Sequence, residues 1–328
     1  MFHRLQPLVA AGAAATIALI AASTSATTSA SPCLPTVMRK RRILLLTDLD
    51  GTLVDKSAHS AQEIEAFNRY WNEHERPNGS VLVYNTARCI NMYTQLVETN
   101  PSLMPPDVLI TGEGTEIRWL IHDSKMTKSF GHDQVRFVPD AEWSEKIHAA
   151  WFKSNLRDQV LSTLNPLDCG KIPNLNDLCN APPHGEARHA ITVDHKTATE
   201  IEHVAQRLTS TIGKDKVKMF HVKGWIEDTE LLTALPAFAG KDGAAKYVAK
   251  KLMFSNSDVL AAGDTKGDQS MVDSTNFAFI CVGNGSEGLK KAWHGRTKTV
   301  KGDYMSMFGG AGGVLDGVME FVHVRTGK

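Results

Sequence analysis

The sequence contains few of the features that mark a disulfide-rich, zinc-knuckle or nucleic-acid-binding protein. Its 328 residues include only five cysteines, and these form no CxxC pair and no zinc-ligand spacing. The 36 lysines and arginines are balanced by 36 aspartates and glutamates, so the formal net charge is zero. A chain without net charge has no global field that would attract nucleic acid or an anionic membrane. We therefore expect no nucleic-acid partner and no stable membrane partner.

Histidine clusters, internal repeats and coiled-coil heptads are also missing. The 13 histidines form no HxxxH pair or comparable group, which argues against a metal centre built on imidazoles. What the chain does have is a hydrophobic content of 42%, enough for a large core in one large domain or two smaller ones. We expect a globular monomer whose partner is a small molecule.

Acidic residues are absent from the first 47 positions. An alanine-rich apolar run at 8–22 is followed by a stretch rich in serine, threonine and alanine at 23–31. This run is shorter than the roughly 20 residues of a membrane-spanning helix, and the composition is typical of a targeting peptide. We expect residues 1–38 to be a cleaved signal or transit peptide for the secretory pathway or an organelle such as the plastid. On the secretory route, Cys169 and Cys179 could form a disulfide.

The first expected strand ends in two closely spaced acids. Residues 43–46 form a continuous apolar run, typical of a strand covered on both faces in a parallel sheet. Asp48 and Asp50 follow this run and share one side of the sheet edge, because side chains alternate along an extended chain. Two carboxylates this close repel each other unless a cation or a proton lies between them. The stretch 42–52 therefore predicts a divalent metal at a sheet edge.

The same strand-and-helix pattern recurs along the chain. Apolar strands are expected at 81–84, 108–110, 259–262 and 277–282. Helical spacing of apolar residues occurs at 60–75, 92–97, 241–252, 289–293 and 313–322. A capping box is expected at Ser60–Glu63. This alternation predicts an α/β fold with a doubly wound, Rossmann-like, mostly parallel sheet as its core.

Residues 118–228 differ in character from this pattern. The segments 190–193 and 217–222 alternate polar and apolar side chains and flank a helical segment at 199–211. Such alternation is typical of antiparallel strands with one solvated face. The sequence therefore predicts an inserted α+β cap domain at 118–228, between two parts of the core domain at 39–117 and 229–328.

Polar side chains collect at four strand ends or helix starts of the predicted core. These residues are Asp48 with Asp50, Thr86 with Arg88, Lys241, and Asp264 with Asp268. Because ligands of open α/β sheets bind beyond the carboxyl ends of the strands, side chains far apart in sequence can share one pocket. Carboxylate oxygens are ligands that Mg²⁺ prefers, and the ion can polarise a phosphate. The group predicts phosphoryl transfer at a Mg²⁺ ion held by Asp48, Asp264 and a backbone carbonyl.

The chemistry of such a site gives its residues separate roles. Asp48, ionised beside a metal and a lysine, can attack phosphorus to give an aspartyl-phosphate. Asp50 can protonate the leaving alcohol and then activate water. Cations and hydrogen-bond donors stabilise the charge that develops on the phosphate. We assign phosphate binding to Thr52, Thr86 and Lys241, and the metal site to Asp48, Asp50 and Asp264.

Four motifs, in this order, resemble those of the haloacid dehalogenase-like hydrolases. They are Asp48-Leu-Asp50-Gly-Thr52, Asn85-Thr86-Ala-Arg88, Lys241, and Gly263-Asp264-Thr-Lys-Gly-Asp268. The predicted insert lies where that superfamily carries its C2-type caps. Within the superfamily, the segments 108–117, 137–143 and 235–241 make the chain similar to the sucrose-6-phosphate phosphatase family. This resemblance covers 43–293 and implies the same roles for Asp48, Asp50, Thr86, Lys241 and Asp264, with Asp268 as a supporting acid near Lys241.

The fourth motif departs from the family pattern. Thr265, Lys266 and Gly267 stand where Ser-Gly-Asn is usual. The missing asparagine normally helps to order the metal site, so this loop bears on metal affinity and geometry. Sugar contacts are expected from Arg88, Glu116 and Arg188, and solvent-facing roles stay open for all three.

Three functions remain compatible with these residues. The first is a Mg²⁺-dependent phosphatase for a sugar phosphate, with sucrose 6-phosphate as the first candidate substrate. The second is the same chemistry on another sugar or polyol phosphate, such as mannosylglycerate phosphate. The third is a catalytically silent homologue that binds sugar phosphates, which the altered fourth motif favours and the intact acids oppose.

Overall fold

The computed structural model describes residues 41–121, 136–164, 189–194, 198–223, 229–296 and 300–326. The predicted targeting segment 1–38, the cysteines Cys169 and Cys179, and Arg188 lie outside the described residues. Within the described ranges, no helix combines the length and the hydrophobicity that crossing a bilayer would require.

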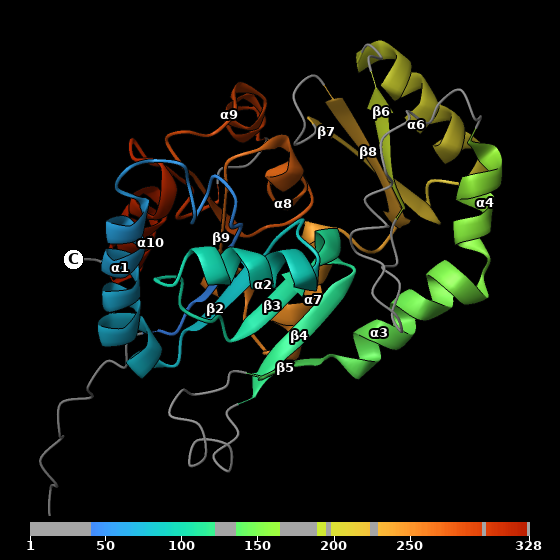
Figure 1. The fold of residues 1–328 in the computed structure, drawn as a ribbon. Coiled ribbons are helices and arrows are strands. Elements are labelled where there is room, and N and C mark those ends of the chain that lie inside the picture. Colours follow the sequence, from blue (N-terminus) through green and yellow to red (C-terminus); the bar gives the residue numbers. More distant parts are fainter. Residues whose placement is uncertain are drawn as a thin grey trace, which may run out of the picture. The chain divides into compact units, whose positions relative to one another are not determined.

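An eight-stranded sheet forms the core, in the order β11-β10-β9-β1-β2-β3-β4-β5 (Figure 1). The strands are β1 (Leu44–Thr47), β2 (Val81–Asn85), β3 (Val108–Thr111), β4 (Glu116–Ile121), β5 (Arg136–Pro139), β9 (Val259–Gly263), β10 (Ala278–Cys281) and β11 (Tyr304–Met305). The pairings from β11 to β3 are parallel, whereas β4 and β5 join in antiparallel fashion. The predicted doubly wound, mostly parallel α/β fold is confirmed.

Strand β1 lies at the centre of this sheet because its apolar run serves two cores at once. Leu44 and Leu46 belong to the hydrophobic cluster on one face of the sheet, and Leu45 belongs to the cluster on the other. All three side chains are fully buried. A strand of this kind gains burial on both faces, so it is favoured between parallel neighbours.

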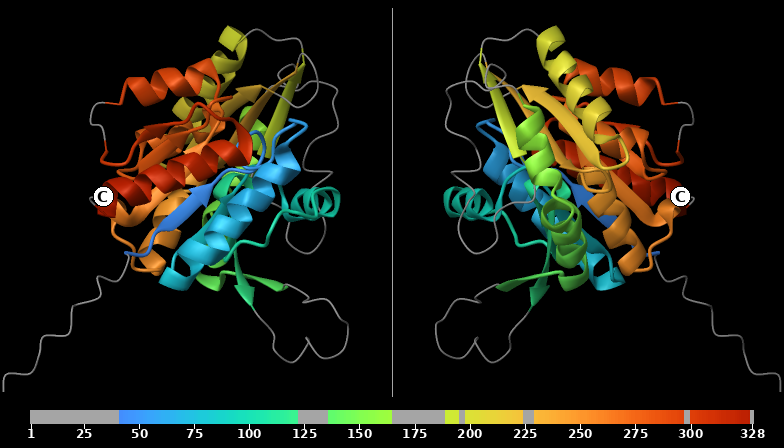
Figure 2. Two further views of the ribbon diagram at one scale, coloured as in Figure 1. Left: turned by 90° about the vertical axis from the view of Figure 1, so that its left-hand side faces the viewer. Right: turned by 90° about the vertical axis from the view of Figure 1, so that its right-hand side faces the viewer.

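Helices cover both faces of the sheet. Apolar side chains of α1, α2 and α10 pack in the cluster that contains Leu45, and those of α7, α8 and α9 pack in the cluster that contains Leu44. Figure 2 shows α1 and α10 side by side on their face. The helices and helical turns of the core are α1 (Ser60–Tyr70), η1 (Trp71–Glu75), η2 (Arg76–Asn78), α2 (Ile90–Thr99), η3 (Gly112–Gly114), α7 (Lys241–Lys251), η6 (Asn256–Asp258), η7 (Lys266–Asp268), α8 (Gln269–Asp273), α9 (Glu287–His294) and α10 (Gly310–Thr326).

The expected capping box at the start of α1 is wrong. Ser60 is the first helical residue, and the preceding His59 makes no capping hydrogen bond with its side chain. The Ser60 hydroxyl instead accepts from the Asp55 amide at 3.3 Å, and Glu63 Oε2 accepts from the Gly312 amide of α10 at 3.3 Å. Glu63 therefore ties α1 to α10 across the helix pair.

A second, three-stranded antiparallel sheet has the order β6-β8-β7. Its strands are β6 (His189–Asp194), β7 (Val217–Lys223) and β8 (Thr229–Pro236), and the helices of this region are α3 (Ala141–His148), η4 (Ala149–Lys153), α4 (Leu156–Thr163) and α6 (Ala198–Ile212). This sheet with its helices is called the cap below. Leu208 and Ile212 of α6 and Leu232 of β8 are buried in one hydrophobic cluster.

The strand pairings place the limits of the cap differently from the predicted range 118–228. Strands β4 and β5 extend the large sheet as far as Pro139, because the turn at Gly112–Gly114 returns the chain beside β3. At the other end, β8 starts at Thr229 but pairs with β6 and β7. The chain therefore crosses from core to cap at Asp140, and back at residues 237–240.

Candidate active site

Four segments bring the predicted site residues to one edge of the large sheet. Strand β1 pairs in register with β9 on one side and with β2 on the other, with Thr47 opposite both Ala262 and Tyr84. The residues that follow these three strands therefore emerge beside one another. They include Asp48 after β1 and Asp264 after β9.

Lys241, the first residue of α7, lies between two of the acids. Its side chain is 3% exposed, and Nζ donates to Asp48 Oδ1 at 2.8 Å and to Asp268 Oδ1 at 2.7 Å. Burial alone would lower the pKa of Lys241, but the Asp268 and Asp48 carboxylates raise it well above its ordinary value. The lysine is therefore a permanent buried cation at this edge, as its predicted phosphate-binding role requires.

Asp48, Asp264 and Asp268 form a buried three-acid cluster. Each contributes an oxygen, and these oxygens lie within 4.8 Å of one another. Burial, opposed in part by Lys241, raises the pKa of Asp48 well above its ordinary value. Burial and the Asp268 charge raise the pKa of Asp264 to about 6. One ammonium thus faces three carboxylates, and a further cation would favour their ionised forms.

The altered loop after β9 is ordered by hydrogen bonds of its own. Thr265 Oγ1 accepts from the Gly267 amide at 3.3 Å, and Asp268 Oδ2 accepts from the amides of Asp264 at 3.2 Å and Thr265 at 3.1 Å. Together these contacts complete a capping box for η7. The threonine and aspartate therefore order this loop without the asparagine that is usual in the family motif.

Thr52 and Gly51 fix the position of Asp264. The Thr52 hydroxyl donates to Asp264 Oδ1 at 2.9 Å. Gly51 has a φ of +80°, and a Cβ at this position would lie 2.2 Å from Asp264 Oδ2. Only glycine adopts this conformation at low cost and lets the carboxylate approach so closely. The structure thus places Thr52, predicted as a phosphate ligand, as a donor to Asp264.

Two asparagines that were not predicted as site residues hold the loops of the site together. Asn284 Nδ2 donates to the Gly51 carbonyl at 2.7 Å, and Asn85 Nδ2 donates to the Lys241 carbonyl at 3.0 Å. Both residues follow or end apolar strands, which is the signal that identified the acids. For Asn284 the sequence Gly283-Asn-Gly285 after β10 carried that signal.

Asp50 lies apart from the three-acid cluster. Its carboxylate accepts from Arg88 Nε and Nη2, both at 2.7 Å, and its side chain is 50% exposed. The predicted sugar contact of Arg88 and the predicted proton transfer of Asp50 therefore involve two residues that bind each other. The Asp50 carboxylate, predicted as a metal ligand, is not among the three acids whose oxygens lie within 4.8 Å of one another.

Thr86 and Glu116 are engaged within the core. Thr86 is fully buried, and its Oγ1 accepts from the Arg88 amide at 3.1 Å. A hydroxyl that accepts one hydrogen bond can still donate its own hydrogen, so Thr86 keeps a donor for a phosphate oxygen in the predicted role. Glu116 Oε2 accepts from Thr111 at 3.0 Å and from Arg118 at 3.2 Å. These contacts occupy one of the two carboxylate oxygens of Glu116.

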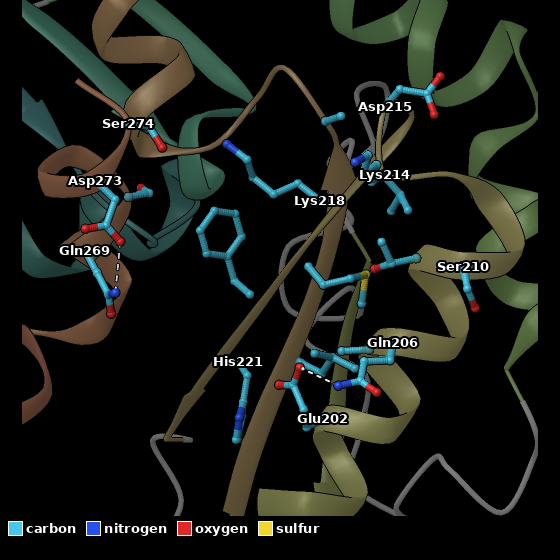
Figure 3. A pocket seen from close by; sticks show the side chains of 18 of the residues that line it. Glu202, Gln206, Ser210, Lys214, Asp215, Lys218, His221, Gln269, Asp273 and Ser274 are labelled. Carbon is cyan, nitrogen blue, oxygen red and sulfur yellow. Dashed lines mark hydrogen bonds between the residues drawn. The ribbon is translucent and has the colours of Figure 1, made fainter. Parts of the chain in front are cut away.

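A pocket of about 970 Å³ lies between the cap and the core beside the altered loop. Figure 3 shows Gln269, Asp273 and Ser274 facing residues of α6 and β7 across it. Lys266 of the altered loop also lines this pocket, whereas the three acids do not. Lys266 therefore belongs to the boundary between cap and core.

The residues of the cluster fit a hard divalent cation. Mg²⁺ prefers oxygen ligands and keeps several waters, so two protein carboxylates suffice. Asp268 uses Oδ1 for Lys241 and Oδ2 for two backbone amides. Asp48 and Asp264 are therefore the better ligands. Burial raises the pKa of both carboxyl groups, so a bound cation would favour their ionised forms.

Comparisons with known proteins show which sequences this chain resembles. A family model described as Sucrose-6F-phosphate phosphohydrolase matches residues 41–322. Probable sucrose-phosphatase 3a of Arabidopsis thaliana is 28% identical over 253 residues, 76% of this chain and 52% of the relative. Sucrose-phosphatase 2 of Nicotiana tabacum is 27% identical over 258 residues, 77% of this chain and 52% of the relative. The chain spans about half the length of these curated relatives.

Solved structures share the fold. The sucrose-phosphatase of Synechocystis sp. PCC6803, in complex with sucrose and phosphate, matches with a TM-score of 0.63 at 21% identity, over 86% of this chain and 98% of that one. A haloacid dehalogenase-like hydrolase from Bacillus subtilis matches with a TM-score of 0.58 at 13% identity, over 86% of this chain and 92% of that one. Because the family model spans nearly all of the described core and cap, the chain belongs to the sucrose-6F-phosphate phosphohydrolase family.

Proposed function

We propose that this chain is a Mg²⁺-dependent phosphatase that hydrolyses a sugar phosphate, with sucrose 6-phosphate as the first candidate. The observation that carries the proposal is the buried cluster of Asp48, Asp264 and Asp268 around Lys241. Membership of the family supports the reaction class. The complex of the Synechocystis enzyme with sucrose and phosphate supports a sugar phosphate as substrate.

In the proposed reaction, Asp48 is the nucleophile. One of its oxygens is held by Lys241, and the other forms a bond to phosphorus while the bond from phosphorus to the sugar oxygen breaks. The sugar oxygen takes a proton from Asp50 as the alcohol leaves. Water then attacks phosphorus, Asp50 accepts its proton, and cleavage of the aspartyl-phosphate regenerates the Asp48 carboxylate and releases phosphate.

The protein's other groups hold the phosphate and its charge. Lys241 supplies a fixed cation, and Thr86 supplies a hydroxyl donor once substrate is present. When bound at Asp48 and Asp264, Mg²⁺ would add positive charge to the phosphate oxygens during the transfer. Asp50 needs a proton when the alcohol leaves, so in the substrate complex one of its two hydrogen bonds with Arg88 must open, while the other keeps the carboxyl group in place.

The identity of the sugar rests on the family. Another sugar or polyol phosphate, such as mannosylglycerate phosphate, would use the same acids and the same lysine. The silent-homologue alternative rests on the replaced residues Thr265, Lys266 and Gly267. The hydrogen bonds that order their loop favour a working site over a decayed one.

A panel of sugar phosphates tests the proposal directly. Phosphate release from sucrose 6-phosphate, mannosylglycerate phosphate and simple hexose phosphates is measured with Mg²⁺ and with a chelator. We expect release from one preferred disaccharide phosphate, dependent on Mg²⁺ and lost in Asp48→Asn. Binding without release from any of them, measured by calorimetry, would establish the silent homologue instead.

The cellular location is a separate proposal. We infer from the composition of residues 1–38 that they direct the chain to an organelle or the secretory pathway and are then removed. N-terminal sequencing of the mature protein from its native cells would reveal a start near residue 39; a start at Met1 would refute the proposal.

A further inference from the structure

Helix α7 contacts both points at which the chain crosses between core and cap. At the first crossing, Asp140 Oδ1 accepts from the Tyr247 hydroxyl at 2.9 Å, and Asp140 Oδ2 accepts from Lys251 Nζ at 2.7 Å. The second crossing, residues 237–240, leads directly into the first turn of α7. Lys241 therefore stands on the helix that anchors both ends of the cap.

Lys218, on the cap strand β7, binds the chain on both sides of Lys241. Its Nζ donates to the Ala239 carbonyl at 3.0 Å and to Asp242 Oδ1 at 2.8 Å. In Figure 3 the Lys218 side chain leaves β7 and runs toward the core. One ammonium of the cap thus holds a residue before Lys241 and a residue after it.

The turn that Lys218 holds has no side-chain cap of its own, although Asn85 Nδ2 donates to the Lys241 carbonyl at 3.0 Å. Gly240, which precedes α7, has a φ of +100° and offers no side-chain cap to the helix. A Cβ on Gly240 would lie 3.2 Å from Lys218 Nζ and 3.2 Å from Phe220 Cζ. Both β7 side chains therefore pack directly against this turn, where a helix start usually depends on its capping residue.

Asp242 needs this partner because its carboxylate is buried. The side chain is 6% exposed, and its other cationic neighbour, Lys246, lies 3.6 Å away and is 47% exposed. A longer contact with a half-exposed lysine contributes little, whereas Lys218 is 27% exposed and lies 2.8 Å from the carboxylate, so its removal would leave a buried charge with only the weaker partner. Lys218 is therefore the main cation that keeps Asp242, and with it the start of α7, in place.

We propose that Lys218 is a positioning residue that couples the cap to Lys241. When the cap strand β7 is seated on the turn, the first turn of α7 is fixed, and the Lys241 ammonium is held between Asp48 and Asp268. The catalytic meaning of this coupling rests on the proposed function, in which Lys241 binds the transferred phosphate. The coupling itself is a property of the fold and can be measured without turnover.

The test compares Lys218→Met with Lys246→Met, which removes a neighbouring charge near the same carboxylate but leaves the turn alone. The first readout is the rate at which a small amine-reactive reagent modifies Lys241, followed by mass spectrometry, with Lys251 as the internal reference. The second is the dissociation constant of inorganic phosphate in Mg²⁺, measured by calorimetry. Lys218→Arg tests rescue, because its guanidinium can reach both acceptors. Asp242→Asn is the second route if Lys218→Met folds poorly.

We expect Lys218→Met and Asp242→Asn to speed Lys241 modification and to weaken phosphate binding about tenfold, because a displaced ammonium loses much of its charge-assisted hydrogen bond to phosphate. Lys218→Arg should restore most of the slow Lys241 modification and most of the phosphate affinity. Lys246→Met should match the wild type in both measurements. Unchanged Lys241 modification in Lys218→Met would overturn the coupling, whatever its effect on melting temperature. If the modification rates change as expected while the wild type binds no phosphate, the coupling stands and the proposed function fails.

Discussion

Arg88 binds Asp50 through two parallel hydrogen bonds, from Nε and Nη2 to the two carboxylate oxygens, each 2.7 Å long. This bidentate geometry fixes the carboxylate in direction as well as in place. Arg88 Nη1 also donates to the Met92 carbonyl at 3.2 Å, which anchors the guanidinium on α2. Asp50, the proposed general acid and base, is therefore oriented by Arg88 in the loop after β2 and not by the three-acid cluster.

Replacing Arg88 should show whether it orients Asp50 or binds the sugar. We expect Arg88→Met to lower kcat about tenfold with little change in KM, because Asp50 loses its orientation. Asp50→Asn should cost more, on the order of 10² to 10⁴ in kcat, the usual contribution of acid–base catalysis. The double variant should be no slower than Asp50→Asn. Steady-state kinetics with the preferred substrate decide, and a raised KM at unchanged kcat in Arg88→Met would assign the arginine to substrate binding.

The acids could be predicted because each follows a strong local signal. Asp48 and Asp264 end continuous apolar runs, and parallel strands must deliver such residues to one edge. Lys241 could be placed only through its family resemblance, since a lysine at a helix start has no favourable dipole interaction of its own. Its contact with Asp48 depends on packing between residues 193 positions apart, and its contact with Asp268 spans 27 positions.

The limits of the cap and the pairings of side chains could not be predicted. Whether β4 joins the large sheet depends on the turn at 112–114, where Glu113 has a φ of +56°. The glycines at 112 and 114 signal a turn, but they do not fix the left-handed conformation of Glu113. The pairing of Arg88 with Asp50 could not be predicted either, because it depends on the distance between the loops that follow β2 and β1. Periodicity reports which face of an element is buried, not which partner lies against it.

Gly51 should be intolerant of any side chain. Alanine there would need a left-handed conformation and would place a methyl group against Asp264 Oδ2, so we expect a loss of about 1–3 kcal/mol in unfolding free energy. The displaced carboxylate should also raise the Mg²⁺ concentration needed for half-maximal activity. Denaturant unfolding and Mg²⁺ titrations of Gly51→Ala measure both effects. Gly79→Ala is the matched control, since Gly79 has a φ of +82° but nothing within 4 Å of its Cβ; equal Mg²⁺ requirements in the two variants would contradict the assignment of Asp264.

Asp264 should make the metal-free protein less stable as the pH rises. Burial and the Asp268 charge raise its pKa from 3.8 to about 6 in the folded chain, so the folded state holds this proton more tightly than the unfolded state. Its favourable contribution is complete below about pH 4 and is lost as the pH rises through 6, a change of up to about 3 kcal/mol.

Asp264→Asn isolates this titration because asparagine keeps the shape and carries no proton. In a chelator, the unfolding free energy of the wild type minus that of the variant should fall between about pH 4 and pH 6.5. Adding Mg²⁺ should reverse the trend above pH 6, because the cation stabilises the ionised carboxylate. Denaturant unfolding at several pH values provides the measurement. A difference that stays constant with pH in the chelator would show that Asp264 has an ordinary pKa.

Variants of Asp268 test whether the altered loop 264–268 is a structural replacement for the usual motif. Asp268 is fully buried, and it binds Lys241 through Oδ1 and the amides of Asp264 and Thr265 through Oδ2. In Asp268→Asn one of these two sets must face an NH₂ group, so we expect a loss of about 3–5 kcal/mol, as for a broken buried pair.

The matched variant is Thr265→Val, which removes the hydroxyl that accepts from the Gly267 amide at 3.3 Å and donates to Asp268 Oδ2 at 3.3 Å. It should cost about 1 kcal/mol, the usual value of a helix cap, and should raise the Mg²⁺ requirement, because the amides around Asp264 lose part of their order. Unfolding curves and Mg²⁺ titrations of both variants measure these effects. If Thr265→Val leaves the Mg²⁺ requirement unchanged while Asp268→Asn raises it, the aspartate alone orders the metal ligands, and the threonine serves only the helical turn.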